Sequence, residues 1–372
     1  MYKIITLVGT RPELIKLSQT IIKLDKNFKN FLVHSGQNYD YELNKIFFKD
    51  LKIRRPDFFL NVKNKVLSKT ISNIIFETDK IIDKIKPDAI LVYGDTNTSL
   101  GLISAKRKKV PIFHMEAGNR CYDFRVPEEI NRRIVDHISD VNLTISEQAK
   151  QNLIAEGLDR NMIFKIGSNM REVIDENIEK IYSSQILKNL KLKKKEYIVV
   201  SLHREENVDS KNRLVKVINM LNDIKTKTKK EIIFSTHPRT KKMIKLHKIS
   251  TKKIKFLKPF GFFDYCNLQN NSYCTISDSG TIFEEAAILD FPAITLRSSH
   301  ERHEGAENGA VIITDFYDDK IIDTIKLSIN SRKNFKPYVD DYMVKNVSQK
   351  VVNIIQSYIK IINNKVWKKN EF

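Results

Sequence analysis

The sequence has few cysteines and no segment that is long and apolar enough to cross a membrane. Its three cysteines, Cys121, Cys266 and Cys274, have neither metal-ligand spacing nor an even count, so neither a disulfide framework nor a metal site is predicted. The first residues, Met1-Tyr-Lys-Ile, lead directly into a strand-like segment without the regions of a secretory signal. We therefore expect a cytoplasmic protein with free thiols.

The sequence also lacks the three-glycine fingerprint of dinucleotide-binding proteins. The first strand-like segment runs into residues 8–16, Val-Gly-Thr-Arg-Pro-Glu-Leu-Ile-Lys, which contain one glycine, so a nicotinamide or flavin cofactor is not indicated. Pro12 stands near the first position of the following helix, where proline is favoured. Arg11 and Lys16 make this helix N-terminus suitable for a phosphate, and a plain turn with surface charges is the alternative.

Aromatic residues are absent from the lysine runs at 191–195, 225–230 and 252–255, which contribute to the net charge of +20. A charge of this size attracts phosphates of any kind, including those of nucleic acids. Without interleaved aromatic residues, however, we expect the runs to be a solvated surface, and no nucleic-acid partner is predicted.

Six arginines lie outside these runs and inside the short motifs described below. Arginine is the side chain suited to bidentate contacts with phosphate or carboxylate groups. Their distribution therefore points to an anionic small ligand. They are Arg11, Arg120, Arg125, Arg132, Arg204 and Arg302.

Segments of strand and helix character alternate through a chain of 372 residues, which is long enough for two domains. Such alternation predicts parallel, helix-flanked sheets. The expected fold class is α/β, with two Rossmann-like parallel-sheet domains facing across a cleft. We place the domains at 1–168 and 169–343, and a C-terminal helix at about 344–364 is expected to pack back on the first domain.

The expected elements follow from the apolar periodicity. Strands are expected at 2–8, 30–34, 89–93, 110–115, 141–144, 163–166, 197–201, 231–235, 254–257, 273–277 and 293–296. In the first half, helices are expected at 12–26, 41–51, 69–85, 98–108, 131–138 and 147–156. The polar stretch from 168 to 195 resembles a connection between domains.

Charged residues follow the ends of neighbouring elements in the first half. Asp95 ends one strand, His114 and Glu116 end the next, and Glu128 and Arg132 lie one turn apart on a helix. Open α/β sheets bind ligands at the carboxyl ends of their strands. We expect these residues to converge on a site of chemistry, although Asp95 taken alone is equally well explained as a helix cap.

The second half places polar residues in equivalent positions. His203 and His237 each follow a strand, where a histidine is more often structural than catalytic. Ser279, Gly280 and Thr281 form a small-residue turn before a helix, and its free N–H groups suit a diphosphate.

Three further residues of this half are candidates for contacts with a nucleoside. Glu285, in the first turns of the helix after that turn, could accept ribose hydroxyls. Phe260 and Tyr265 lie near a turn, where they either pack in the core or form a stacking wall for a base.

Six spaced motifs follow one another in order over nearly the whole chain. They are Gly-Thr-Arg-Pro-Glu at 9–13, Gly-Asp-Thr at 94–96, His-Met-Glu-Ala-Gly at 114–118, Pro-Glu-Glu-Ile-Asn-Arg at 127–132, His-Arg-Glu-Glu-Asn at 203–207, and Asp-Ser-Gly-Thr with Glu-Glu-Ala at 278–286. Together these motifs resemble the non-hydrolysing UDP-N-acetylglucosamine 2-epimerases, and a further family motif is similar to residues 301–304, Glu-Arg-His-Glu.

The resemblance implies a GT-B fold, a homodimer, no redox cofactor, and inversion at C2 of a UDP-2-acetamido sugar for bacterial polysaccharide synthesis. The family reaction eliminates UDP to give a 2-acetamidoglycal and then adds UDP back. By position, the implied catalytic residues are Asp95, Glu116, Glu128, Arg132 and His203. The implied substrate-binding residues are Arg11, Lys16, Ser279, Gly280, Thr281, Glu285 and Arg302, with Phe260 and Tyr265 at the uracil; His237 is added from its place after a strand.

Some positions depart from the commonest family pattern. Residues 119–125, Glu205 and Thr281 look more like the branch that acts on UDP-2-acetamido-2,6-dideoxy-L-talose and makes UDP-N-acetyl-L-fucosamine. His303 stands where proline is usual. The Arg-Gln pair of an allosteric site in some members is absent from residues 67–70, so that regulation is not expected.

Other functions remain open on the sequence alone. A GT-B glycosyltransferase would share the two-domain cleft and the UDP site, but would need an acceptor. A hydrolysing epimerase would release free sugar and UDP. A basic nucleic-acid binder would show steeply salt-dependent binding.

Overall fold

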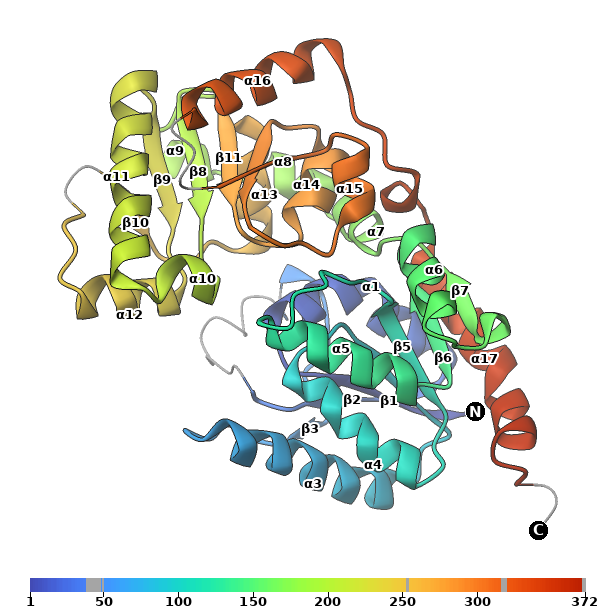
Figure 1. The fold of residues 1–372 in the computed structure, drawn as a ribbon. Coiled ribbons are helices and arrows are strands. Elements are labelled where there is room, and N and C mark those ends of the chain that lie inside the picture. Colours follow the sequence, from blue (N-terminus) through green and yellow to red (C-terminus); the bar gives the residue numbers. More distant parts are fainter. Residues whose placement is uncertain (38–47, 49, 252–253, 316–319, 370–372) are drawn as a thin grey trace. The chain divides into compact units, whose positions relative to one another are not determined.

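The computed structural model describes residues 1–37, 48, 50–251, 254–315 and 320–369 and forms two compact units (Figure 1). Unit 1 comprises Met1–Val173 with Asp341–Phe372, and unit 2 comprises Ile174–Asp340. The chain passes between the units in α7 (Met170–Asp175) and in the 3-10 helix η3 (Asp340–Tyr342). The helix expected at 41–51 lies mostly outside the described residues.

Unit 1 is built on a parallel sheet with the strand order β3-β2-β1-β4-β5-β6-β7. Its inner strands are nearly continuous apolar runs, as expected for strands that helices cover on both faces; every residue of β4, for example, is buried. The strands are β1 (Lys3–Val8), β2 (Lys29–His34), β3 (Phe58–Phe59), β4 (Ala89–Tyr93), β5 (Ile112–Ala117), β6 (Val141–Thr144) and β7 (Ile163–Lys165).

The helices of unit 1 flank this sheet (Figure 1). The C-terminal helix α17 (Val347–Lys365) buries an apolar stripe of Val351, Ile355, Ile359 and Ile362 and packs against α1 (Arg11–Asn27). The segment expected as one helix at 98–108 is a 3-10 turn, η1 (Asn97–Gly101), followed by α4 (Leu102–Arg107). The others are α1 (Arg11–Asn27), α3 (Leu67–Ile85), α5 (Pro127–Ile138), α6 (Glu147–Ala155), η2 (Arg160–Met162) and α17 (Val347–Lys365).

Unit 2 repeats the architecture with the parallel strand order β10-β9-β8-β11-β12-β13. Its strands are β8 (Tyr197–Ser201), β9 (Glu231–Ser235), β10 (Lys255–Leu257), β11 (Cys274–Ser277), β12 (Ala293–Leu296) and β13 (Ile312–Thr314). Its helices are α8 (Ile178–Tyr182), α9 (Ile186–Asn189), α10 (Glu205–Val208), α11 (Lys211–Thr228), α12 (Pro238–Leu246), α13 (Phe262–Asn271), α14 (Ile282–Leu289), α15 (His303–Glu307) and α16 (Ile321–Asn334).

Each sheet reverses its strand order at one point, and this point locates the candidate sites. In unit 1 the order reverses between β1 and β4, and in unit 2 between β8 and β11. Doubly wound sheets bind ligands outside the carboxyl ends of the strands at such a point.

The predicted α/β class with two parallel sheets is confirmed. Within the described part of the chain, no helix is long and apolar enough to span a membrane.

Candidate functional site

The switch point of unit 1 carries a buried cluster of charges around Glu116, the penultimate residue of β5. Lys16 Nζ and the Tyr93 hydroxyl each donate to Glu116 Oε2 at 2.8 Å. Arg132 Nη2 donates to Glu116 Oε1 at 3.2 Å. Lys16, Glu116 and Arg132 are only 4%, 7% and 2% exposed, so their charges act in an environment that screens them weakly.

Arg132 ties this cluster to the end of the neighbouring strand. One arm of its guanidinium donates to the carbonyl of Glu116, and the other donates to the Asp95 carboxylate. Asn131 Nδ2 donates to the Asp95 carbonyl at 3.0 Å. The cluster thus sets two cations, Lys16 and Arg132, against two carboxylates, and a planar guanidinium fixes the position of both acids.

The backbone of Glu116 is held in an unusual conformation. Its φ of +62° lies in the left-handed region, which costs a non-glycine residue about 1–2 kcal/mol. The pairing of β5 with β6 shifts register between Met115 and Ala117, at the same place. Such bulges and strained residues re-aim side chains beside functional sites, and here the affected side chain is the central carboxylate.

Glu13, a residue that the sequence did not single out, lies beside this cluster. Its Oε2 accepts from the Gly9 N–H at 2.6 Å and its Oε1 accepts from the Thr96 hydroxyl at 2.7 Å. Burial raises the pKa of the Glu13 carboxyl to about 7, although these hydrogen bonds oppose the rise. Glu13 therefore links the turn after β1 to the loop that carries Asp95.

A second buried network, which includes His114 and Arg120, lies next to this cluster and contacts the backbone before Asp95. His114 Nε2 lies 2.8 Å from the Gly94 carbonyl, and His114 Nδ1 lies 2.8 Å from Asp136. Arg120 Nη1 donates to Asp136 at 2.7 Å, and Arg120 also pairs with Glu156. Burial raises the pKa of Asp136, but His114 and the arginines outweigh it and hold that pKa below its usual range.

This network corrects two expectations. Arg120 is fully buried and binds protein carboxylates, so its charge is used inside the fold rather than on an anionic ligand. His114 faces Gly94 and Asp136 from the interior of β5 and fixes the backbone next to Asp95. Sequence spacing could not show this, because Asp136 and Glu156 come from two different helices, or their ends, further along the chain.

Glu128 does not join the cluster. It lies exposed in the first turn of α5, and among the described residues it makes no hydrogen bond or ion pair with Glu116, Asp95 or Arg132. The buried acid of that turn is instead Glu129, which accepts from the Cys121 N–H at 2.9 Å and pairs with Arg133. Arg125 extends into solvent and pairs with Asp123.

The switch point of unit 2 is organised by the buried carboxylate of Asp278, directly after β11. It accepts from the backbone N–H groups of His203 and Arg204 at about 3 Å and from Asn207 Nδ2 at 2.9 Å. The His203 ring lies 3.1 Å from Asp278 and is partly exposed. Burial raises the pKa of Asp278, but His203 and these donors lower it to about 2. Asp278 thus fixes the loop and the ring of His203.

The turn Ser279, Gly280, Thr281 follows Asp278 and precedes α14. Ser279 Oγ and Thr281 Oγ1 lie 3.0 Å apart, and the Ser279 N–H donates to Ser277 Oγ at 3.1 Å. A β-carbon at Gly280 would approach Glu301 Oε1 to 2.7 Å, so glycine allows the Glu301 carboxylate to pack closely against this face of the turn. All three residues are partly exposed at a helix N-terminus, which is suited to an anion.

The residues expected at a nucleoside pack around one side of the β8 strand. Phe260 and Tyr265 are partly buried against a cluster that includes Tyr197 and Leu268, which supports the core-packing interpretation. Glu285 is buried and accepts from Gln269 Nε2 at 2.6 Å. Burial raises the pKa of the Tyr265 phenol, and the charge of Glu285 adds to the rise.

The last two predicted residues differ in exposure. Arg302 is 2% exposed at the start of α15, with its Nε 3.6 Å from Glu284. His237 is exposed at the start of α12, and its ring centroid lies 5.4 Å from that of His203. Within unit 2 the structure therefore brings His203 close to His237 and to the turn after β11.

Arg11 lies partly exposed at the first position of α1, one turn before Lys16. Unit 1 thus offers carboxylates for proton transfer, and unit 2 offers backbone and side-chain donors for an anion. Within the described ranges, no group of three or more His, Cys, Asp or Glu side chains could hold a metal ion.

The chain is similar to known proteins over most of its length. The family model described as UDP-N-acetylglucosamine 2-epimerase matches residues 21–356. The UDP-N-acetylglucosamine 2-epimerase of Methanocaldococcus jannaschii is 38% identical over 350 residues, which are 90% of this chain and 94% of the relative.

Two solved structures extend the comparison to the fold. The UDP-N-acetylglucosamine 2-epimerase of Rickettsia bellii has a TM-score of 0.91 and 47% identity, with 99% of each chain covered. The Methanocaldococcus jannaschii enzyme, solved with UDP-GlcNAc and UDP, has a TM-score of 0.88 and 35% identity and covers 95% of this chain and 99% of its own.

Proposed function

Because the chain belongs to the UDP-N-acetylglucosamine 2-epimerase family, we propose that it inverts C2 of a UDP-2-acetamido sugar without hydrolysing it. The observation that carries this proposal is the buried cluster in which Lys16 and Arg132 fix the carboxylates of Glu116 and Asp95. A carboxylate that two cations orient at a switch point is suited to remove or deliver a proton at one carbon. The product would serve polysaccharide synthesis.

The proposed reaction has two steps, elimination of UDP and its re-addition, and carboxylates transfer the proton in both. In the first, a carboxylate of the set Asp95, Glu116 and Glu128 takes the C2 proton while the C1–O bond breaks and UDP leaves with the electron pair, giving a 2-acetamidoglycal. In the second, a protonated acid of the same set returns a proton to the opposite face of C2 while a UDP oxygen bonds to C1. The sugar leaves with inverted C2, and proton exchange with solvent returns the two acids to their starting protonation states.

The C2 proton is not adjacent to a carbonyl, so its removal depends on stabilising the charge that develops on the departing UDP. We assign this to Arg11, to His203, held by Asp278, and to the Ser279–Thr281 turn. Removing a single preorganised donor of this kind costs about 10²–10³-fold in rate in other enzymes. Arg302 and His237 complete the proposed anion contacts, while Phe260, Tyr265 and Glu285 hold the uridine.

We also propose which UDP-sugar is the substrate. Both UDP-N-acetylglucosamine and UDP-2-acetamido-2,6-dideoxy-L-talose fit the chemistry, and we favour the second because residues 119–125, Glu205 and Thr281 depart from the common motif pattern. In unit 1 this segment includes the exposed side chains of Tyr122, Phe124 and Arg125, which are accessible for selection of the sugar.

The experiment offers each UDP-sugar alone to the purified full-length chain and follows it by proton NMR. We expect a new anomeric signal for the C2 epimer, no acceptor requirement, and free UDP well below the amount of epimer. Stoichiometric free UDP with free sugar would indicate a hydrolysing epimerase. An absolute requirement for an acceptor would indicate a glycosyltransferase, and either result would contradict the proposal.

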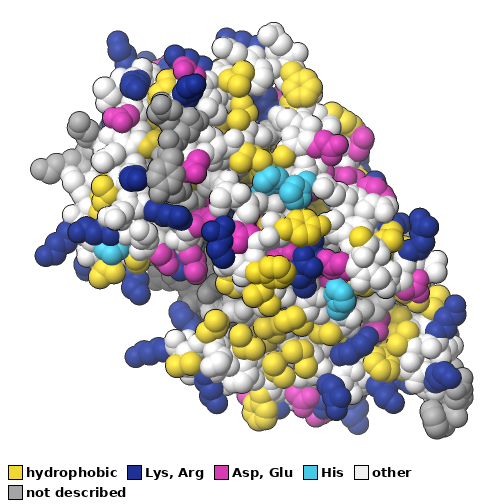
Figure 2. Space-filling view, in the orientation of Figure 1, with side chains coloured by type: hydrophobic (Ala, Val, Ile, Leu, Met, Phe, Trp, Pro, Cys, Tyr) yellow, Lys and Arg dark blue, Asp and Glu magenta, His cyan; other side chains and the backbone are white. Residues whose placement is uncertain are grey.

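We further propose that the chain works as a homodimer through unit 1. Large apolar side chains are exposed on three successive helices: Leu67 and Phe76 on α3, Ile103 on α4, and Ile130 and Ile134 on α5. Figure 2 shows hydrophobic side chains gathered over this part of unit 1. A contiguous exposed apolar patch marks an interaction site, and a twofold dimer covers such a patch with its own copy.

Light scattering coupled to gel filtration tests this assignment. Phe76→Glu combined with Ile130→Glu should give a monomer, whereas Leu327→Glu, a matched change at an exposed apolar residue of α16 in unit 2, should leave the dimer intact. A wild-type chain that is monomeric at micromolar concentration would refute the dimer.

A further inference from the structure

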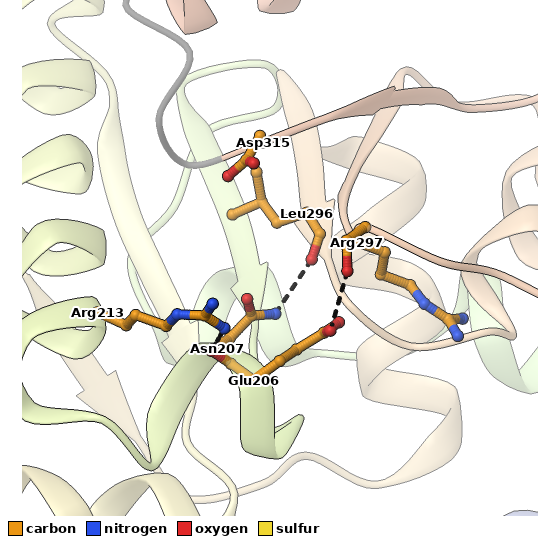
Figure 3. Close-up of a pocket in the computed structure, with 7 residues that line it drawn as sticks. Glu206, Asn207, Arg213, Leu296, Arg297 and Asp315 are labelled. Carbon is orange, nitrogen blue, oxygen red and sulfur yellow. Dashed lines mark hydrogen bonds between the residues drawn. The ribbon is translucent and has the colours of Figure 1, made fainter. Parts of the chain in front are cut away.

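Arg297 was not among the sequence candidates, yet its position beside the switch point of unit 2 is unusual. It directly follows β12, the strand that pairs with β11. Its side chain is 0% exposed. In the pocket drawn in Figure 3, its guanidinium points away from the Glu206 and Asn207 side chains that line the same pocket.

Two of the three guanidinium nitrogens of Arg297 are hydrogen-bonded within the protein. Nε donates to the Ser299 carbonyl at 2.9 Å, and Nη2 donates to Glu301 Oε2 at 2.6 Å. Nη1 is buried and has no hydrogen-bond partner among the described residues. A buried donor without a partner destabilises a folded protein by about 1–3 kcal/mol, and by more when the group is charged. The presence of such a donor here therefore needs an explanation.

The unpartnered nitrogen faces the turn before α14. Arg297 Nη1 lies 3.6 Å from the place a β-carbon would occupy at Gly280. Gly280 has no side chain between this donor and the backbone of the turn, so the donor lies close to the N-terminus of the eight-residue helix α14. Buried donors that converge at a helix N-terminus favour an anion.

Glu301 holds the guanidinium in this orientation. Burial raises the pKa of Glu301, but the charges of Arg297, Arg204 and Arg302 outweigh it and keep that pKa well below its usual range. Arg204 Nη2 also lies 3.8 Å from Glu301. Glu301 is therefore shared between Arg297 and Arg204, while the nearby Arg302 lies beside Glu284.

We propose that Arg297 Nη1 donates a hydrogen bond to the diphosphate of UDP bound at the Ser279–Thr281 turn, with Glu301 as the positioning residue that aims it. This rests on the proposed function, which supplies the nucleotide, and it adds a contact that the sequence motifs did not include. A nucleoside without phosphates would not use this contact.

The test measures binding of UDP and of uridine to the full-length chain by calorimetry. Arg297→Gln should weaken UDP binding by about 10–100-fold, the range for a hydrogen bond to a charged group, and change uridine binding less than about threefold. Arg297→Lys keeps the charge and can still pair with Glu301, but lacks Nη1, so its UDP affinity should remain reduced. If the Arg297→Gln variant does not fold, the Arg297→Lys variant alone still tests the proposal.

Arg332→Gln is the matched control. Arg332 is another mostly buried arginine of unit 2, and it bonds Asp290 and the Ala310 carbonyl. Its loss should lower stability and leave the affinities for UDP and uridine unchanged.

Equal losses of UDP and uridine affinity in both Arg297 variants would show a purely structural role and overturn the inference, as would unchanged UDP affinity. Absence of UDP binding to the wild-type chain would instead refute the proposed function. The failure of one claim is therefore distinguishable from the failure of the other.

Discussion

The two switch points hold their polar groups in opposite ways. In unit 1, Lys16, Glu116, Arg132 and Asp95 satisfy one another in a buried cluster. In unit 2, the Ser279–Thr281 turn is partly exposed, and the nearby Arg297 Nη1 is buried without a partner in the described residues.

The two arrangements suit different tasks. A cluster with balanced charges keeps its carboxylates in fixed places, as proton transfer to and from one carbon requires. A turn with donors left open stabilises charge only when an anion arrives. Changes in unit 1 should therefore affect the chemical step, and changes in unit 2 should affect binding of the nucleotide.

The largest expected effect is that of Glu116→Gln. We expect interconversion to fall by about 10³-fold, within the range for loss of a general acid or base, while UDP affinity changes little because the shape of the site is kept. NMR rates and calorimetry measure the two quantities. Asp140→Asn, at a buried acid that accepts from the N–H of Ile112 at the far end of β5, should keep the rate; an equal loss there would show that the effect is structural.

Glu128→Gln tests whether an exposed acid shares the chemistry with the buried one. We expect a loss of about 10²-fold in rate with the free energy of unfolding changed by less than about 0.5 kcal/mol, as for other surface substitutions. Rate assays and urea unfolding provide both values. Unchanged activity would remove Glu128 from the catalytic set and leave Glu116 and Asp95 as the acids.

Gly280→Ala adds one methyl group to the turn of unit 2. Its β-carbon would meet Glu301 Oε1 at 2.7 Å, and Arg297 holds this carboxylate at 2.6 Å, so stability should fall by about 1–3 kcal/mol. We expect UDP to bind about tenfold more weakly, with a smaller change for uridine. Equal affinity for UDP would argue that the diphosphate does not approach this turn.

A further prediction concerns Glu13 and the pH dependence of stability. Its pKa is raised from 4.5 to about 7, so the folded state retains a proton that the unfolded chain releases above pH 4.5. The stability linked to this proton is full below that pH and is lost as pH rises to about 7, by ~3 kcal/mol at most. Glu13→Gln should remove this slope in urea unfolding at several pH values, and an identical slope in the variant would refute the assignment.

Much of the fold was predictable because its inner strands are apolar runs that alternate with helical periodicity. The edge strand β3 was missed because two residues are too few to show a pattern, whereas β13 was overlooked although it lies in the apolar run Ala310-Val-Ile-Ile-Thr314. The helix expected at 98–108 begins instead as a 3-10 turn around Gly101, where the chain packs closely on Thr78.

The sequence indicated which residue types the site would contain, but not which of them would form ion pairs or hydrogen bonds with one another. The sequence indicated Lys16 and Glu116, yet their ion pair joins residues 100 positions apart. The raised pKa of Glu13 and the open donor of Arg297 depend on burial, which spacing does not reveal. Arg120 was misinterpreted for the same reason, because its partner carboxylates come together only in the folded chain.

The central claim is tested most directly by running the reaction in D2O and examining the recovered UDP-sugar by NMR. A proton that leaves C2 to a carboxylate exchanges with solvent, so we predict deuterium at C2 of the product epimer. If the product epimer instead retains protium at C2, the result would contradict the proposed mechanism. In that case the C2 proton would not have passed to Glu116 or a neighbouring carboxylate that exchanges with solvent.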